Sequence, residues 1–116
     1  MAHGGRFDFV NLRADDPMLA RYAKAWGPRE TSEQRWAVHG ALFYLGKGDP
    51  AAPMFLNTSD AESPEFRDGL SLLAKRLKEA GTECVYSVDA DGRGHRVSTD
   101  PKTLAAAYAF FAKHLK

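Results

Sequence analysis

The chain has 116 residues, of which 44% are hydrophobic and 27% charged, and this composition predicts one folded domain. Lysine and arginine number 16 against 15 aspartates and glutamates, and the basic residues are scattered, so we expect neither nucleic acid nor a membrane as partner. The single cysteine, Cys84, excludes a disulfide within this chain and a metal site built from several thiolates.

No segment predicts membrane insertion or export. The first residues contain no basic stretch followed by an apolar run, as a signal peptide would. The apolar runs of the chain, such as residues 41–45, are far shorter than the ~20 residues that span a bilayer. We therefore expect a cytoplasmic protein, although a leader that had been removed would leave no trace here.

The first half of the chain predicts one strand and two short helices. Phenylalanine and valine at residues 7–10 indicate the strand. An aspartate before proline at residues 15–17, followed by apolar residues at helical spacing up to Trp26, predicts the first helix. Residues 31–34 fit a capping box, in which the Thr31 side chain caps a second helix that carries Trp36.

The second half predicts two further strands and two longer helices. After a glycine- and proline-rich connection at 46–53, the apolar run 54–56 indicates a buried strand. Ser63-Pro64 begins an amphipathic helix that ends at Gly81, residues 84–88 form the next strand, and Asp100-Pro101 begins the last helix. The alternation of strands and helices predicts an α/β fold in which about three parallel strands form a single unit, residues 1–116.

Chemically useful residues follow the last two predicted strands. Ligands and catalytic groups of parallel sheets collect at the carboxyl ends of the strands, which directs attention to residues 57–60 and 89–95. Asp60 and His95 are the candidates there. The alternative for Asp60 is an ordinary turn residue beside a helix start, and the alternative for His95 is a loop histidine without a function. Residues 89–92 lack the further ligands of a calcium loop, so we expect no metal.

This order of elements resembles the C-terminal part of an α/β-hydrolase of the esterase, acetyl esterase or prolyl-oligopeptidase-like type. The resemblance is carried by Pro-Met-Phe-Leu-Asn-Thr-Ser-Asp at 53–60, the helix and strand that follow, and Gly-Arg-Gly-His at 92–95. Residues 5–9 are similar to the sixth strand of that fold. The family often has His-Gly before the loop of the acid, where this chain has Leu56-Asn57 or Asn57-Thr58.

The resemblance implies a partial three-layer α/β-hydrolase unit and a serine hydrolase of carboxylic esters or peptides. In it Asp60 is the acid and His95 the base of a Ser-His-Asp triad, with no cofactor and no metal. No serine of the chain lies in a Gly-x-Ser-x-Gly elbow, so the nucleophile segment is missing and we expect the isolated chain to be inactive. The alternatives are a non-catalytic interaction module and a subunit completed by a separate N-terminal chain; a partial sheet in either case predicts a homo-oligomer or a complementing partner.

Overall fold

The computed structural model describes residues 5–45 and 51–115, so the predicted connection at 46–53 lies partly outside the described residues. The elements are the helices α1 (Leu19–Trp26) and α2 (Glu33–Ala37), the short 3₁₀ helix η1 (Ala41–Phe43), the strand β1 (Met54–Ser59), the helix α3 (Pro64–Glu79), the strand β2 (Cys84–Asp89) and the helix α4 (Pro101–His114).

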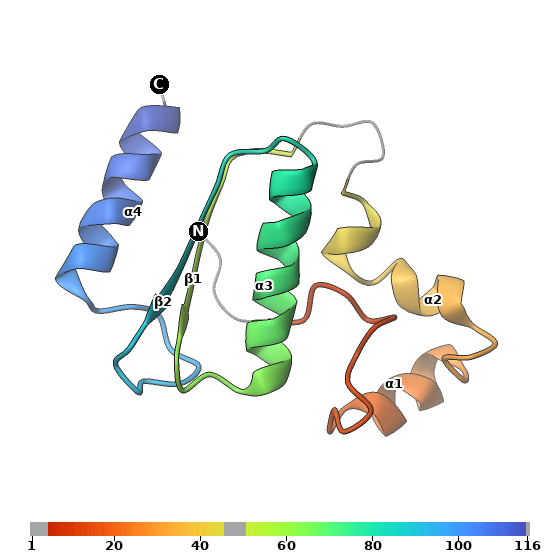
Figure 1. The fold of residues 1–116 in the computed structure, drawn as a ribbon. Helices are drawn as coiled ribbons and strands as arrows, with labels where there is room; N and C mark the ends of the chain where they lie inside the picture. Colours follow the sequence, from red (N-terminus) through yellow and green to blue (C-terminus); the bar gives the residue numbers. More distant parts are fainter. Residues whose placement is uncertain (1–4, 46–50, 116) are drawn as a thin grey trace.

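The two strands form a parallel sheet between two helices. The pairing runs from Met54 opposite Cys84 to Ser59 opposite Asp89, and α3 makes the crossover between the strands. Figure 1 shows α3 on one side of the sheet and α4 on the other, with α1 and α2 lying beyond α3. The fold is therefore α/β as predicted, but the described residues form two strands rather than three.

Alternation along β1 divides the core in two. Leu56 points to α3 and packs among its leucines, including Leu70 and Leu77, all three with no exposed surface. Phe55 points the other way and packs against Phe110 of α4, at 5.9 Å between the ring centroids. Both faces of β1 are buried, which explains its continuous apolar start.

The strand predicted at residues 7–10 is wrong. The carboxylate of Asp8 accepts hydrogen bonds from the backbone N–H groups of Val10 (3.0 Å) and Asn11 (3.3 Å) and bends the chain into a turn. The ring of Phe9 packs edge-on to Tyr22 and Trp26, at 5.3 and 5.5 Å, instead of covering a sheet. A side chain that bonds its own backbone has replaced the strand pairing.

The first two helices begin later than predicted. Asp16 bonds the N–H of Met18 at 2.8 Å, and its buried carboxylate also receives the Arg6 guanidinium, so α1 begins after it, at Leu19. The predicted cap at Thr31 is wrong as well, because the N-cap of α2 is Ser32 and its side chain makes no capping bond.

The second half follows its sequence signals closely. The helix α3 begins at Pro64, and the turn after it contains Gly81 with φ of 76°, the left-handed conformation that favours glycine. The side chain of Asp100 caps α4 by accepting from the N–H of Lys102 at 2.8 Å. Among residues 5–45 and 51–115, no helix has both the length and the apolar character needed to cross a bilayer.

Candidate functional site

The loops that follow β1 and β2 begin side by side. Because the strands are parallel and in register, β1 ends at Ser59 directly beside Asp89, the last residue of β2. The N–H of Asp60 donates to the carbonyl of Asp89 at 2.9 Å. The two candidate segments, 57–60 and 89–95, are therefore brought together as the topology predicts.

Asp89 is the centre of a buried polar network at this edge. Its carboxylate accepts from Ser98 (2.6 Å) and from Thr103 of α4 (2.7 Å). It also accepts from Asn57 of β1 (3.2 Å) and from Arg93 in its own loop (2.5 Å). Burial by itself raises the pKa of Asp89, but these hydrogen bonds outweigh it and hold that pKa at about 2. The network ties both strands, the loop and α4 together around one ionised carboxylate.

His95 is held by a carboxylate, that of Glu62. The Nδ1 atom of its ring lies 2.7 Å from Oε2 of Glu62, whose side chain is 3% exposed, while the His95 side chain is 50% exposed. A carboxylate without a proton can only accept, and with Glu62 in that form Nδ1 carries the hydrogen of this bond. The ring also leans on Phe66 of α3, at 4.8 Å between centroids. A half-exposed imidazole oriented by a buried carboxylate is an arrangement suited to proton transfer.

Asp60 makes different contacts. Its Oδ1 accepts from the backbone N–H of Gly92 at 3.0 Å and from the hydroxyl of Ser59 at 3.3 Å, and its own carbonyl accepts from Arg67 at 3.2 Å. These bonds join the loop after β1 to the loop that carries His95. Asp60 thus lies at the predicted edge, but the carboxylate in contact with Nδ1 of His95 comes from Glu62, two residues further along.

Sequence reasoning missed Glu62. One signal was available: the chain has Leu56-Asn57 or Asn57-Thr58 where the α/β-hydrolases that it resembles often have His-Gly, so the resemblance does not fix the position of the acid. Glu62 also stands directly before Ser63-Pro64, where a helix starts; the glutamate's Oε1 accepts from the N–H of Ser63 at 3.0 Å. That bond turns the side chain back over the loop toward His95.

The chain's thiol is poorly placed as a nucleophile for His95. Cys84 begins β2, at the opposite end of the strand from the loop of His95. Burial raises the pKa of the Cys84 thiol, with nearby Lys78 acting in the other direction, so the reactive thiolate is disfavoured.

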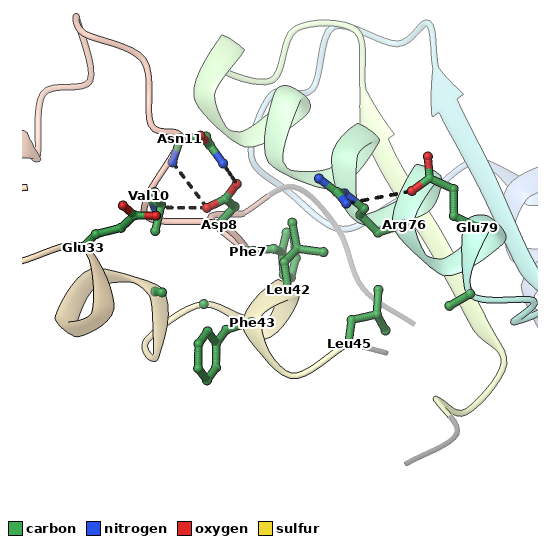
Figure 2. Close-up of a pocket in the computed structure, with 13 residues that line it drawn as sticks. Phe7, Asp8, Val10, Asn11, Glu33, Leu42, Phe43, Leu45, Arg76 and Glu79 are labelled. Atoms are coloured by element: carbon green, nitrogen blue, oxygen red, sulfur yellow. Dashed lines mark hydrogen bonds and ion pairs between the residues drawn. The ribbon is translucent and has the colours of Figure 1, made fainter. Parts of the chain in front are cut away.

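A separate cavity of about 420 Å³ lies at the other end of α3. Figure 2 shows apolar side chains from the N-terminal segment and η1, among them Phe7 and Leu42, facing the last turn of α3, where Arg76 pairs with Glu79. Arg76 is twelve residues beyond Pro64, or roughly 18 Å along the helix axis. The cavity is thus remote from His95 and is not part of the same site.

Within residues 5–45 and 51–115, no three histidine, cysteine, aspartate or glutamate side chains are grouped so that they could hold a metal ion. Comparison of the chain with protein-family models, with curated proteins and with solved structures found no match.

Proposed function

We propose that this chain provides the base and the carboxylate of a serine-hydrolase-type site acting on carboxylic esters or peptides. The observation that carries the proposal is the contact between His95 and buried Glu62 at the carboxyl ends of β1 and β2. The arrangement of elements and the Gly-Arg-Gly-His turn that resembles the α/β-hydrolases support the same assignment. The nucleophilic serine is not part of this chain in the proposal and comes from a complementing polypeptide.

Each group has a defined task in this reaction. Nε2 of the His95 ring takes the proton of the attacking hydroxyl as its oxygen bonds the acyl carbon, and then returns a proton to the departing alcohol or amine. The carboxylate of Glu62 keeps the hydrogen on Nδ1, so that Nε2 can accept, and stabilises the imidazolium that forms. Asp60 keeps the two loops together through Gly92.

The test is cleavage of 4-nitrophenyl acetate by the chain alone. Loss of one triad member costs about three to six decades in rate, so we expect only slow release, far below that of a complete serine hydrolase. His95→Ala should bring this release down to the buffer rate. His39→Ala, which removes an exposed imidazole next to Trp26, should leave it unchanged.

Two amides distinguish the carboxylates. Glu62→Gln should lower the slow rate by roughly tenfold, because the amide no longer stabilises an imidazolium. Asp60→Asn should lower it much less, because that side chain bonds the loop rather than the ring. The reverse order would make Asp60 the acid, as the resemblance implies. Equal rates for His95→Ala and the unmodified chain would refute the proposal, and enzyme-like rates would refute the missing nucleophile.

A second candidate function, an interaction module, is favoured by the outer edge of β2. The parallel register points the N–H and C=O groups of Tyr86 and Val88 away from β1, and in the described part of the chain no strand pairs with them. Val85 and Val88, on opposite faces of the sheet, are 36% and 49% exposed. Another strand beside β2 would cover both side chains and pair the edge, as in a homo-oligomer or a complex with a complementing chain.

Sedimentation over a concentration series tests this candidate. The unmodified chain should gain mass with concentration, and Val88→Pro, which removes an outward N–H, should stay monomeric. Val88→Thr keeps that N–H and should still associate. A monomer at every concentration would count against an interaction through β2 between copies.

A further inference from the structure

The turn that presents His95 is closed on both sides of the histidine. The N–H of Arg96 donates to the carbonyl of Gly94 at 2.9 Å, so His95 is the central residue of a three-residue turn. Gly92 and Gly94 have φ of 64° and 70°, which a side chain at either position would strain. The side chain of Arg93 reaches across this turn, and its Nε donates to the carbonyl of Arg96 at 2.8 Å.

The other nitrogens of Arg93 connect this turn to the sheet. Its Nη1 donates to Asp89 (2.5 Å) and to Asp91 (2.6 Å), and its Nη2 donates to the side-chain carbonyl of Asn57 at 2.7 Å. Asn57 belongs to β1 and Asp89 to β2, and the Arg93 side chain is only 9% exposed. One planar guanidinium therefore holds the residue after His95 and both strands in a single rigid geometry.

The position of Glu62 depends on the end of β1. It follows the end of β1 by three residues, and its N–H donates to the carbonyl of Ser59 at 3.1 Å. The distance between Nδ1 of His95 and Oε2 of Glu62 thus depends on the positions of the loop after β1 and the loop after β2 relative to the end of β1. Asp60 links these loops through the backbone of Gly92, and Asp89 joins Asn57 to Ser98, three residues after His95. Arg93 bonds both Asn57 of β1 and the residue directly after His95.

We propose that Arg93 is the positioning residue that holds the His95 ring against Glu62 and so fixes its Nδ1–H form; the role in catalysis rests on the proposed function. A charge alone does not suffice for this task. A lysine ammonium could still neutralise Asp89 and Asp91, but its three hydrogens are too few to bond both carboxylates, Asn57 and the carbonyl of Arg96 together. The positioning role needs the separate N–H groups on the three nitrogens of the guanidinium.

The test is the tautomer of His95, read from the ¹⁵N shifts of its ring at a pH at which the ring is neutral. In the unmodified chain we expect the Nδ1–H form to dominate. Arg93→Lys should remain folded by circular dichroism and lose that form in favour of Nε2–H. The matched control is Arg35→Lys, the same substitution at an exposed arginine of α2, which should leave the tautomer unchanged. An unchanged tautomer in folded Arg93→Lys would overturn the proposal.

A second measurement uses the unmodified chain and so does not depend on any variant folding. The Nε–H of Arg93 should exchange with solvent at least roughly tenfold more slowly than that of exposed Arg35, because its bond to the carbonyl of Arg96 must first open. Equal exchange rates would overturn the proposal. Neither measurement involves ester cleavage: a lost tautomer in Arg93→Lys with unaffected cleavage in His95→Ala would refute the proposed function and leave the positioning role in place.

Discussion

The two halves of the molecule are held together in different ways. Residues 54–115 form long elements around two core clusters, and in the larger cluster Leu56, Leu70 and Leu77 have no exposed surface. Residues 5–45 form short helices, and the only apolar side chain in that stretch that is fully buried is Trp36. Its neighbours are stacked and edge-on rings, such as Tyr22 on Trp26 at 4.9 Å.

This difference shows where cooperativity comes from. Ring contacts contribute about 0.5–1.5 kcal/mol each beyond the area they bury, whereas one buried aliphatic side chain stabilises by about 1.5–3 kcal/mol. The N-terminal half reaches the main core through few side chains, among them Phe7, Leu42 and Leu45. We therefore expect it to open at a lower free energy than the C-terminal half.

The largest effect we expect comes from Leu70→Ala in α3. Its side chain is fully buried in the main core, so truncation should lower the free energy of unfolding by about 2–5 kcal/mol. The matched control is Leu19→Ala in α1, a half-buried leucine, which should cost less than half as much. Urea unfolding measures both. Equal losses would show that the two halves form one cooperative unit and would break the comparison.

A smaller effect is expected in acid, through Asp89 in the C-terminal half. Its pKa is about 2 in the folded chain against 3.8 for an ordinary aspartate, and its side chain is 5% exposed. Because the pKa of Asp89 is lower in the folded chain than in the unfolded chain, its ionised carboxylate stabilises the fold. This contribution to the free energy of unfolding is complete above about pH 4 and is lost as the pH falls toward 2. A shift of this size corresponds to about 2 kcal/mol.

Unfolding in urea at pH 5 and at pH 2.5 measures this loss. Asp89→Asn cannot titrate, so its stability should fall less between the two pH values than that of the unmodified chain. An equal loss of stability in Asp89→Asn and in the unmodified chain would show that Asp89 does not cause the loss of stability in acid.

The same contrast explains how far sequence reasoning reached. In β1, α3, β2 and α4 the spacing of the apolar residues and the end signals Gly81 and Asp100 indicate the same element bounds. Those elements were therefore predicted within a few residues. In the N-terminal half the apolar residues around Asp8 suggested a strand, but the carboxylate bonds the backbone at Val10 and Asn11 instead. Pattern alone does not reveal such a competition between a side chain and a strand partner.

The site shows the same limit. Its place at the carboxyl ends of the strands follows from the topology, and His95 lies there as expected. The carboxylate partner does not follow from topology, because Asp60 and Glu62 are two residues apart in one loop. Their roles depend on the path of that loop, which is set by the bonds from Asp60 to Gly92 and from Glu62 to Ser63. The contacts of Asp60 with Gly92 and of Glu62 with His95 join residues 32 and 33 positions apart, and contacts at such separations leave no pattern in the sequence.

The smallest effect we expect, Gly69→Ala, tests the joint between the halves. In an ordinary helix this substitution stabilises by about 0.5–1 kcal/mol. Here the N-terminal segment crosses α3 at Gly69, and a Cβ would lie 2.2 Å from the carbonyl oxygen of Gly5. The clash is with backbone, so the segment must move; overpacking of this kind costs about 1–3 kcal/mol, and the net loss is about 1 kcal/mol.

Hydrogen exchange resolves where the loss from Gly69→Ala falls. Residues 5–8 should exchange faster, while the amides of α3 and of the sheet keep their protection, because the helix itself gains from alanine. The control is Gly81→Ala, where open space surrounds the added carbon but φ is 76°, so that the cost is confined to the end of α3. Uniform loss of protection in Gly69→Ala would mean that the crossing belongs to the core, and that the weakly held half begins further along the chain.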